Sequence, residues 1–156
     1  MTTLTAVRST EPSPDYYTIG YASRTFDEFA QTLIAADIQC LVDVRKHPVS
    51  MWRPEFSKKN IKSGLAMHGI EYVHIPELGV PTERRKSLKK QADYDALWDW
   101  YDSEVVYGNA HRNLKWYFNY AQNTLAIMCV EYDAIECHRH RLSAGLERLG
   151  LVGSHL

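Results

Sequence analysis

The chain has 156 residues, of which 45% are hydrophobic and 24% are charged, and its formal net charge at pH 7 is −1. This suits one globular domain and excludes a disordered chain, and the near-zero charge gives no global signal for nucleic-acid binding. An odd number of cysteines, a tail without the apolar core of a signal peptide and the absence of an apolar run of about 20 residues predict a cytoplasmic protein with reduced thiols and no membrane span.

The first part of the sequence predicts a strand–helix–strand unit after a flexible tail. Residues 1–15 are rich in Thr, Ser and Pro without periodicity, which predicts a flexible N-terminal tail. The aromatic and β-branched segment 16–21 predicts a strand. Thr25 and Glu28 form a capping-box pattern that begins a helix. The apolar run 38–44 predicts a second strand, buried on both faces.

The remaining sequence continues to alternate between helix and strand patterns. Helices are predicted over 56–67, 94–107, 111–122 and 138–149, and strands over 70–75 and 124–130, with a fifth strand starting at 151–152. This alternation predicts an α/β fold with three layers: a mainly parallel sheet of about four to five strands, with helices on both faces. We therefore expect residues 16–156 to form a single α/β domain.

The densest group of reactive side chains follows the fourth predicted strand, in the pattern Cys129-x-Glu131-x5-Cys137-His138-Arg139. Ligands of parallel sheets bind at the carboxyl ends of the strands, and a helix N-terminus stabilises a thiolate or an anion. Glu131 and His138 are candidate catalytic residues for proton transfer. Cys129 and Cys137 are candidate catalytic nucleophiles. Arg139 is a candidate ligand for phosphate or carboxylate.

Other interpretations of this loop stay open. Cys129 is equally well explained as a small core residue at the end of a buried strand. His138 and Arg139 also suit a solvated first turn of a helix. The residue types suit zinc, but their spacing matches no standard pair of ligands, so we expect no metal, and we expect no cofactor. The phosphatase spacing Cys-x5-Arg, counted from Cys137, reaches Ser143, so no phosphatase or sulfurtransferase is assigned.

A second candidate region begins where the second predicted strand ends. Arg45 and Arg53 stand among lysines and aromatic residues, a mixture that can hold phosphates and stack bases, so we assign both arginines to substrate binding. The alternative is a solvated helix face of lysines with Trp52 and Phe56 turned to the core. The basic run 84–90 is predicted to be a mobile surface segment that attracts polyanions.

Several short motifs are distributed over most of the chain: Thr18–Tyr21, Leu41–Arg45, Pro48, Phe56, Tyr72–Gly79, Cys129–Glu131 and Cys137–Arg139. Together they resemble the domain-of-unknown-function family 488. The resemblance implies a compact α/β domain with a shared polar site, and it supplies no reaction. Tyr21 and Gly79 lie in these segments and complete the candidate substrate-binding set. The sequence departs from the family at 132–134, where Tyr-Asp-Ala replaces the usual Asp-Pro.

Three functions follow from these patterns. The first is an enzyme acting on a phosphate-bearing substrate, either a nucleotide or a nucleic acid. The second is a non-catalytic module that binds nucleotide or nucleic acid through the basic and aromatic stretches. The third is a structural interaction domain that assembles, for example as a homodimer, through an incomplete sheet edge.

Overall fold

The structure is a computed structural model that describes residues 13–86, 88–110, 124–130 and 139–156. Its centre is a five-stranded sheet in the order β3-β2-β4-β1-β5, with every neighbouring pair parallel. The strands are β1 (Tyr16–Gly20), β2 (Cys40–Asp43), β3 (Glu71–His74), β4 (Leu125–Cys129) and β5 (Gly153–His155). The predicted parallel α/β sheet is therefore confirmed.

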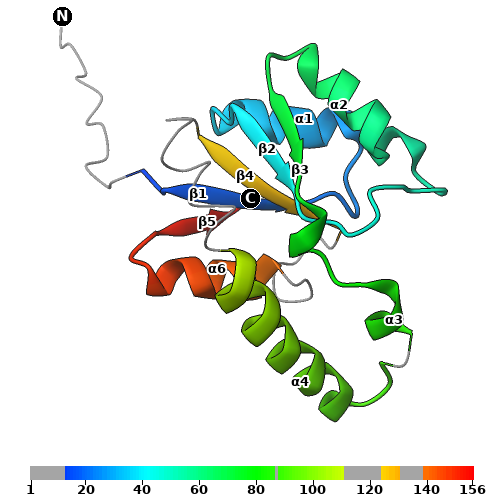
Figure 1. Cartoon of the computed structure of the whole chain (residues 1–156). Helices are drawn as coiled ribbons and strands as arrows, with labels where there is room; N and C mark the ends of the chain where they lie inside the picture. Colours follow the sequence, from blue (N-terminus) through cyan, green and yellow to red (C-terminus); the bar gives the residue numbers. More distant parts are fainter. Residues whose placement is uncertain (1–12, 87, 111–123, 131–138) are drawn as a thin grey trace, which may run out of the picture.

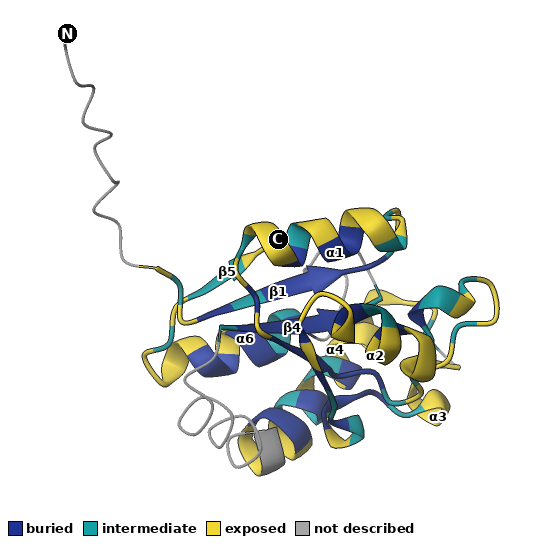
Figure 2. Ribbon diagram, turned by 90° about the horizontal axis from the view of Figure 1, so that it is seen from above, coloured by how far each residue is buried: buried dark blue, intermediate teal, exposed yellow. Residues whose placement is uncertain are grey.

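Helices cover both faces of this sheet, which confirms the three predicted layers (Figure 1). One face packs against α1 (Phe26–Ala35) and α2 (Lys58–Ala66), and the other against α4 (Gln91–Trp100), the π-helix η3 (Tyr101–Ala110) and α6 (Arg139–Arg148). Successive strand residues point to opposite faces. Leu41 of β2 accordingly joins the core beside α1 and α2, whereas Val42 joins the core beside α4 and α6. Figure 2 shows buried inner and exposed outer helix surfaces.

Several helix ends follow their predicted signals. The Thr25 side chain accepts a hydrogen bond from the backbone N–H of Glu28 at 3.1 Å, as expected of an N-cap. Gly69 and Gly150, which follow α2 and α6, adopt positive φ angles of 72° and 86°. The predicted cap Ser57 precedes α2 but makes no capping bond, because its hydroxyl bonds the backbone of the preceding loop instead.

The segment after β3 differs from its predicted form. Two short helices occupy it, η2 (Pro76–Leu78) and α3 (Thr82–Arg85), where a loop and a mobile basic run were expected. The next helix begins at Gln91 instead of about residue 94. The cause is the Asp93 carboxylate, which accepts the backbone N–H groups of Lys89 and Lys90 at 3.0 and 2.9 Å. The predicted helix 111–122 lies outside the described residues. No helix within the described ranges is long and apolar enough to cross a membrane.

The strand order determines where the sheet can bind a ligand. β1 and β4 are neighbours, with Gly20 opposite Cys129. The helix after β1 covers one face of the sheet, and the helix after β4 covers the other. The helices that follow these adjacent strands therefore lie on opposite faces of the sheet. In open α/β sheets, ligands bind outside the carboxyl ends of the strands at such a point.

Candidate functional site

A buried ion pair between Asp43 and Arg45 stands at the end of β2. The guanidinium donates from Nε to Oδ1 at 2.9 Å and from Nη2 to Oδ2 at 2.7 Å. The backbone N–H of Arg45 also donates to Oδ1, at 3.0 Å. Asp43 and Arg45 are only 0% and 3% exposed. These charge-assisted bonds are therefore protected from water, which strengthens them.

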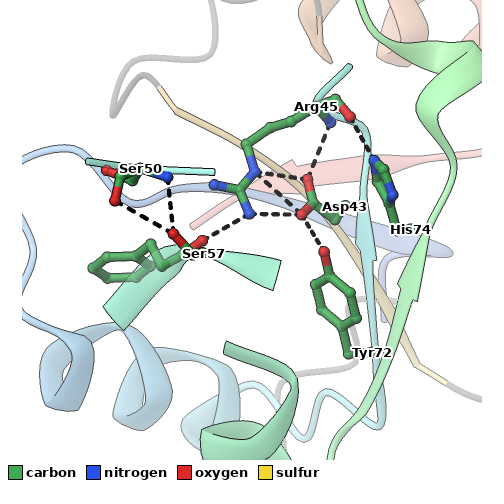
Figure 3. Close-up of polar contacts among 7 residues, drawn as sticks. Asp43, Arg45, Ser50, Ser57, Tyr72 and His74 are labelled. Carbon is green, nitrogen blue, oxygen red and sulfur yellow. Dashed lines mark hydrogen bonds and ion pairs between the residues drawn. The ribbon is translucent and has the colours of Figure 1, made fainter. Parts of the chain in front are cut away.

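Neighbouring elements fix this pair from both sides (Figure 3). Tyr72 of β3 donates its hydroxyl to Asp43 Oδ2, and Arg45 Nη2 donates to the Phe56 carbonyl at 2.8 Å. The His74 ring nitrogen Nε2 lies 2.7 Å from the Arg45 carbonyl oxygen. Burial alone would lower the pKa of the Arg45 guanidinium, but the hydrogen bonds and charge of Asp43 raise this pKa above its ordinary value. Arg45 is therefore a permanent cation.

One guanidinium nitrogen of Arg45 is not used by this network. Nη1 is buried and has no hydrogen-bond partner among the described residues. Figure 3 shows it directed away from Asp43. A buried donor left unsatisfied costs about 1–3 kcal/mol, and more when it is charged. In native proteins such a donor is usually met by water, an ion or a ligand.

Arg45 also lines a cavity of about 150 Å³ at the carboxyl edge of the sheet. The described residues around this cavity follow β1, β2, β3 and β4: Tyr21, Arg45, Lys46, His47, Val49, Val80, Thr82, Arg85 and Val130. This set includes the cations Arg45, Lys46 and Arg85 and contains no carboxylate, which favours an anion. Pockets that enclose drug-sized ligands measure roughly 300–1,000 Å³. The cavity therefore suits one compact group rather than a whole nucleotide.

Gly79 lies against the backbone of Lys46, a residue that lines this cavity. A Cβ atom on Gly79 would lie 2.3 Å from the backbone nitrogen of Lys46 and 2.6 Å from its Cα, which no side chain tolerates. Glycine alone lets the segment after β3 approach the segment after β2 so closely. Gly79 thus acts through its backbone, and its predicted contact with a substrate stays a prediction.

Arg53 links the segment after β2 to the segment after β1. Its Nη1 donates to the Tyr21 carbonyl at 2.9 Å, its Nη2 to the Arg24 carbonyl, and its Nε to Glu55 at 3.2 Å. Its Cζ lies 4.5 Å from the centroid of the Phe56 ring. The protein therefore already engages all three of these nitrogens. The predicted role of Arg53 in substrate binding stays a prediction.

The aromatic residues near Arg45 divide between core and surface. Phe56 is fully buried and stacks on Tyr21, with ring centroids 4.4 Å apart. Tyr21 lines the cavity, and its ring centroid lies 5.3 Å from Arg45 Cζ. Trp52 is 96% exposed. The alternative that both Trp52 and Phe56 turn to the core therefore holds for Phe56 and is wrong for Trp52.

The structure describes only part of the predicted cysteine loop. Three of the predicted catalytic residues lie outside the described residues: Glu131, Cys137 and His138. Cys129 ends β4, is 1% exposed and belongs to the core beside α6, while the next residue, Val130, lines the cavity. Arg139 begins α6 and is fully buried. In the described part of the chain, no group of three or more His, Cys, Asp or Glu residues could hold a metal ion.

Sequence reasoning did not assign the other basic residues of the cavity to the site. Lys46 and His47 directly follow Arg45, and that position was the available signal. Arg85 reaches the cavity from α3, a helix that the sequence pattern did not predict. Asp43 was identified within a motif, but its bonds to Arg45 and Tyr72 depend on the tertiary structure.

These features define an α/β protein with a parallel sheet and a cationic cavity at the carboxyl edge. The chain belongs to the family described as "Domain of unknown function DUF488", whose model matches residues 25–146. The predicted family is therefore confirmed, and the matched range includes Arg45, Gly79, Cys129 and Arg139. No curated protein and no solved structure matches the chain.

Proposed function

We propose that this protein binds a phosphate-bearing ligand, a nucleotide or a nucleic acid, with one phosphate group in the cavity at the carboxyl edge. The observation that carries the proposal is the buried Nη1 of Arg45, which lacks a partner among the described residues. A phosphate oxygen would accept from this donor, and Lys46 and Arg85 would add charge from the same cavity. The small volume of the cavity agrees with a single phosphate group.

In the enzymatic form of the proposal, the cysteine loop acts on the ligand held by Arg45. Glu131 or His138 transfers a proton, and Cys129 or Cys137 is the nucleophile. The contact of Arg139 with a phosphate stays a prediction, because Arg139 is fully buried and is not among the described residues that line the cavity. Replacing Glu131→Gln and Cys137→Ser should then abolish turnover and leave the fold intact. Unchanged turnover of an identified activity in both variants would reject these roles.

The second candidate function is binding without chemistry. The exposed Trp52 supports it, because an aromatic surface near a phosphate site is typical of proteins that bind unpaired bases. We also propose that the protein is cytoplasmic and keeps its thiols reduced, which is compatible with the enzymatic function and with binding alone. Assembly of copies through β5, at the edge of the sheet, is the structural alternative.

The direct test is calorimetric titration with inorganic phosphate, pyrophosphate and sulfate. We expect saturable binding, weakened roughly 5- to 10-fold in Lys46→Gln and Arg85→Gln, because one partly solvated charge contributes about 1 kcal/mol. Lys59→Gln is the matched control, since Lys59 is exposed on α2 and does not line the cavity. Equal affinity in all four proteins, or no binding of any anion, would overturn the proposal.

A further inference from the structure

The loop that carries Arg45 also carries an exposed apolar tip, formed by Val49, Met51 and Trp52. These side chains are 71%, 90% and 96% exposed. Val49 lines the cationic cavity, so the tip and the cavity are continuous. Figure 1 shows the segment between β2 and α2 extending beyond the carboxyl ends of the strands. Val49, Met51 and Trp52 do not belong to either hydrophobic core cluster.

Hydrogen bonds hold the base of the tip on both sides of Trp52. The backbone N–H of Ser50 donates to the Ser57 hydroxyl at 2.9 Å (Figure 3), and the backbone N–H of Arg53 donates to the Ser50 hydroxyl at 3.1 Å. The backbone N–H of Lys58 donates to the Pro48 carbonyl at 2.8 Å. The loop is thus fixed before any ligand arrives, which lowers the entropic cost of binding through its tip.

We propose that Trp52 stacks on an unpaired base of a single-stranded nucleic acid whose phosphate occupies the cavity. This inference rests on the proposed phosphate site. The cavity of about 150 Å³ takes a phosphate group and leaves the sugar and base outside. A base that lies over the exposed indole gains stacking energy whatever its sequence, because every base has a π-face. Duplex bases are already stacked on one another, so the strand that fits is single.

The surroundings of the tip favour nucleic acid over a protein partner. Arg45, Lys46 and Arg85 line the adjoining cavity, and no described residue of that lining is acidic. A standard protein interface buries about 800 Å² on each partner around an apolar centre. Three apolar side chains beside a cationic cavity suit a phosphate and a base better than such an interface.

The test is fluorescence anisotropy of a labelled single-stranded oligothymidylate with the full chain. We expect Trp52→Ala to weaken binding about 5- to 150-fold, the range found for one stacked base, and Trp52→Phe to retain most of the affinity. Inorganic phosphate should bind both variants like the unmodified protein, because Trp52 does not line the cavity. Met67→Ala, at another apolar side chain that is 87% exposed, is the control and should change neither affinity. The logarithm of the affinity should fall with the logarithm of salt concentration, with a slope of about −0.7 for each neutralised phosphate.

The outcomes separate the two proposals. If phosphate binds but Trp52→Ala holds the oligonucleotide as tightly as the unmodified protein, the stacking role is wrong and the phosphate site stands. If neither phosphate nor oligonucleotide binds, both proposals fail. Competition by a duplex or a free mononucleotide as strong as that by the single strand would overturn the single-strand assignment. Self-association abolished by Trp52→Ala, without oligonucleotide binding, would assign the tip to a second copy of the chain.

Discussion

Two arginine–carboxylate pairs of this protein have nearly the same contacts and very different surroundings. Arg45 bonds Asp43 at the carboxyl edge, and Arg141 of α6 bonds Asp102 of η3. In each pair, Nε donates to Oδ1, at 2.9 and 3.0 Å, and Nη2 donates to Oδ2. The side chains of the edge pair are 4% and 0% exposed, whereas those of the helix pair are 31% and 29% exposed.

Contact geometry alone therefore does not identify a functional arginine. A buried ion pair loses so much solvation that apolar residues of similar volume often stabilise a fold as well or better. Stability therefore gives little reason to retain Asp43 and Arg45. Ligand binding in the cavity gives a better reason, because the ion pair holds a charged guanidinium at the cavity wall and its Nη1 is available to a ligand.

The largest expected effect comes from Arg45→Met, which leaves the buried Asp43 carboxylate without its counter-ion. We expect the free energy of unfolding, measured by urea denaturation, to fall by about 3–5 kcal/mol. The double variant Asp43→Asn with Arg45→Met should recover much of this loss, because no uncompensated charge remains. If Arg141→Met costs as much as Arg45→Met, the two pairs contribute equally to stability and burial does not distinguish them.

Tyr72→Phe is expected to have the next largest effect, because it removes the hydroxyl that donates to Asp43. A hydrogen bond to a charged group contributes about 1.5–3 kcal/mol, and the free energy of unfolding should fall by that amount. Tyr94→Phe is the control, since Tyr94 is 42% exposed and should tolerate the change. Equal stability of Tyr72→Phe and the unmodified protein would mean that Asp43 needs only Arg45.

The same tyrosine predicts a dependence on alkaline pH. Burial, and then the charge of Asp43, raise the pKa of Tyr72 above its ordinary value of 10.0. The unfolded chain therefore releases the Tyr72 proton at a lower pH than the folded chain. The stability that Tyr72 contributes is fully present below about pH 10 and is lost as the pH rises toward the folded pKa. Urea titrations above pH 10 should show a shallower decline for Tyr72→Phe.

Gly79→Ala tests whether the rim of the cavity depends on the close approach to Lys46. The added Cβ would lie 2.3 Å from backbone, which cannot move aside as a flexible side chain does. We expect a loss of about 1–3 kcal/mol in the free energy of unfolding, together with weaker phosphate binding. Gly108→Ala is the matched control, because the nearest atom to its added Cβ is the Ser103 carbonyl oxygen, at 3.7 Å. Unchanged stability and phosphate binding in Gly79→Ala would show that the two segments are not rigidly apposed.

Much of the fold could be predicted from local sequence patterns. Runs of apolar residues predicted the buried strands, since β2 and β4 are buried at every position. Local signals such as Thr25 and Gly69 correctly predicted helix ends. The start of α4 could not be predicted from apolar spacing, because the side chain of Asp93 determines it.

The contacts within the site could not be predicted from local sequence patterns, because they depend on which strands are neighbours in the sheet. Asp43 lies opposite His74 in the parallel register of β2 and β3, and Tyr72, two residues earlier, points to the same face and reaches the carboxylate. Recognising this bond requires knowing that β3 lies beside β2. The positions of Arg45, Tyr21 and Gly79 at the carboxyl edge depend on the tertiary structure in the same way, because each residue follows a different strand of the parallel sheet.

The smallest expected effect is that of Arg141→Met, and the variants of the two pairs should also differ in their response to salt. A partly exposed ion pair contributes about 0–1 kcal/mol, so the variant should lose no more than that. In about 1 M NaCl the screening length falls to about 3 Å, and the loss should approach zero. The loss caused by Arg45→Met should change little between about 0.1 M and about 1 M NaCl, because water and ions do not reach that pair. A large loss for Arg141→Met that persists in salt would mean that the contact between α6 and η3 excludes water as completely as the edge of the sheet does. Burial would then no longer distinguish the arginine that we assign to ligand binding from the one that only joins two helices.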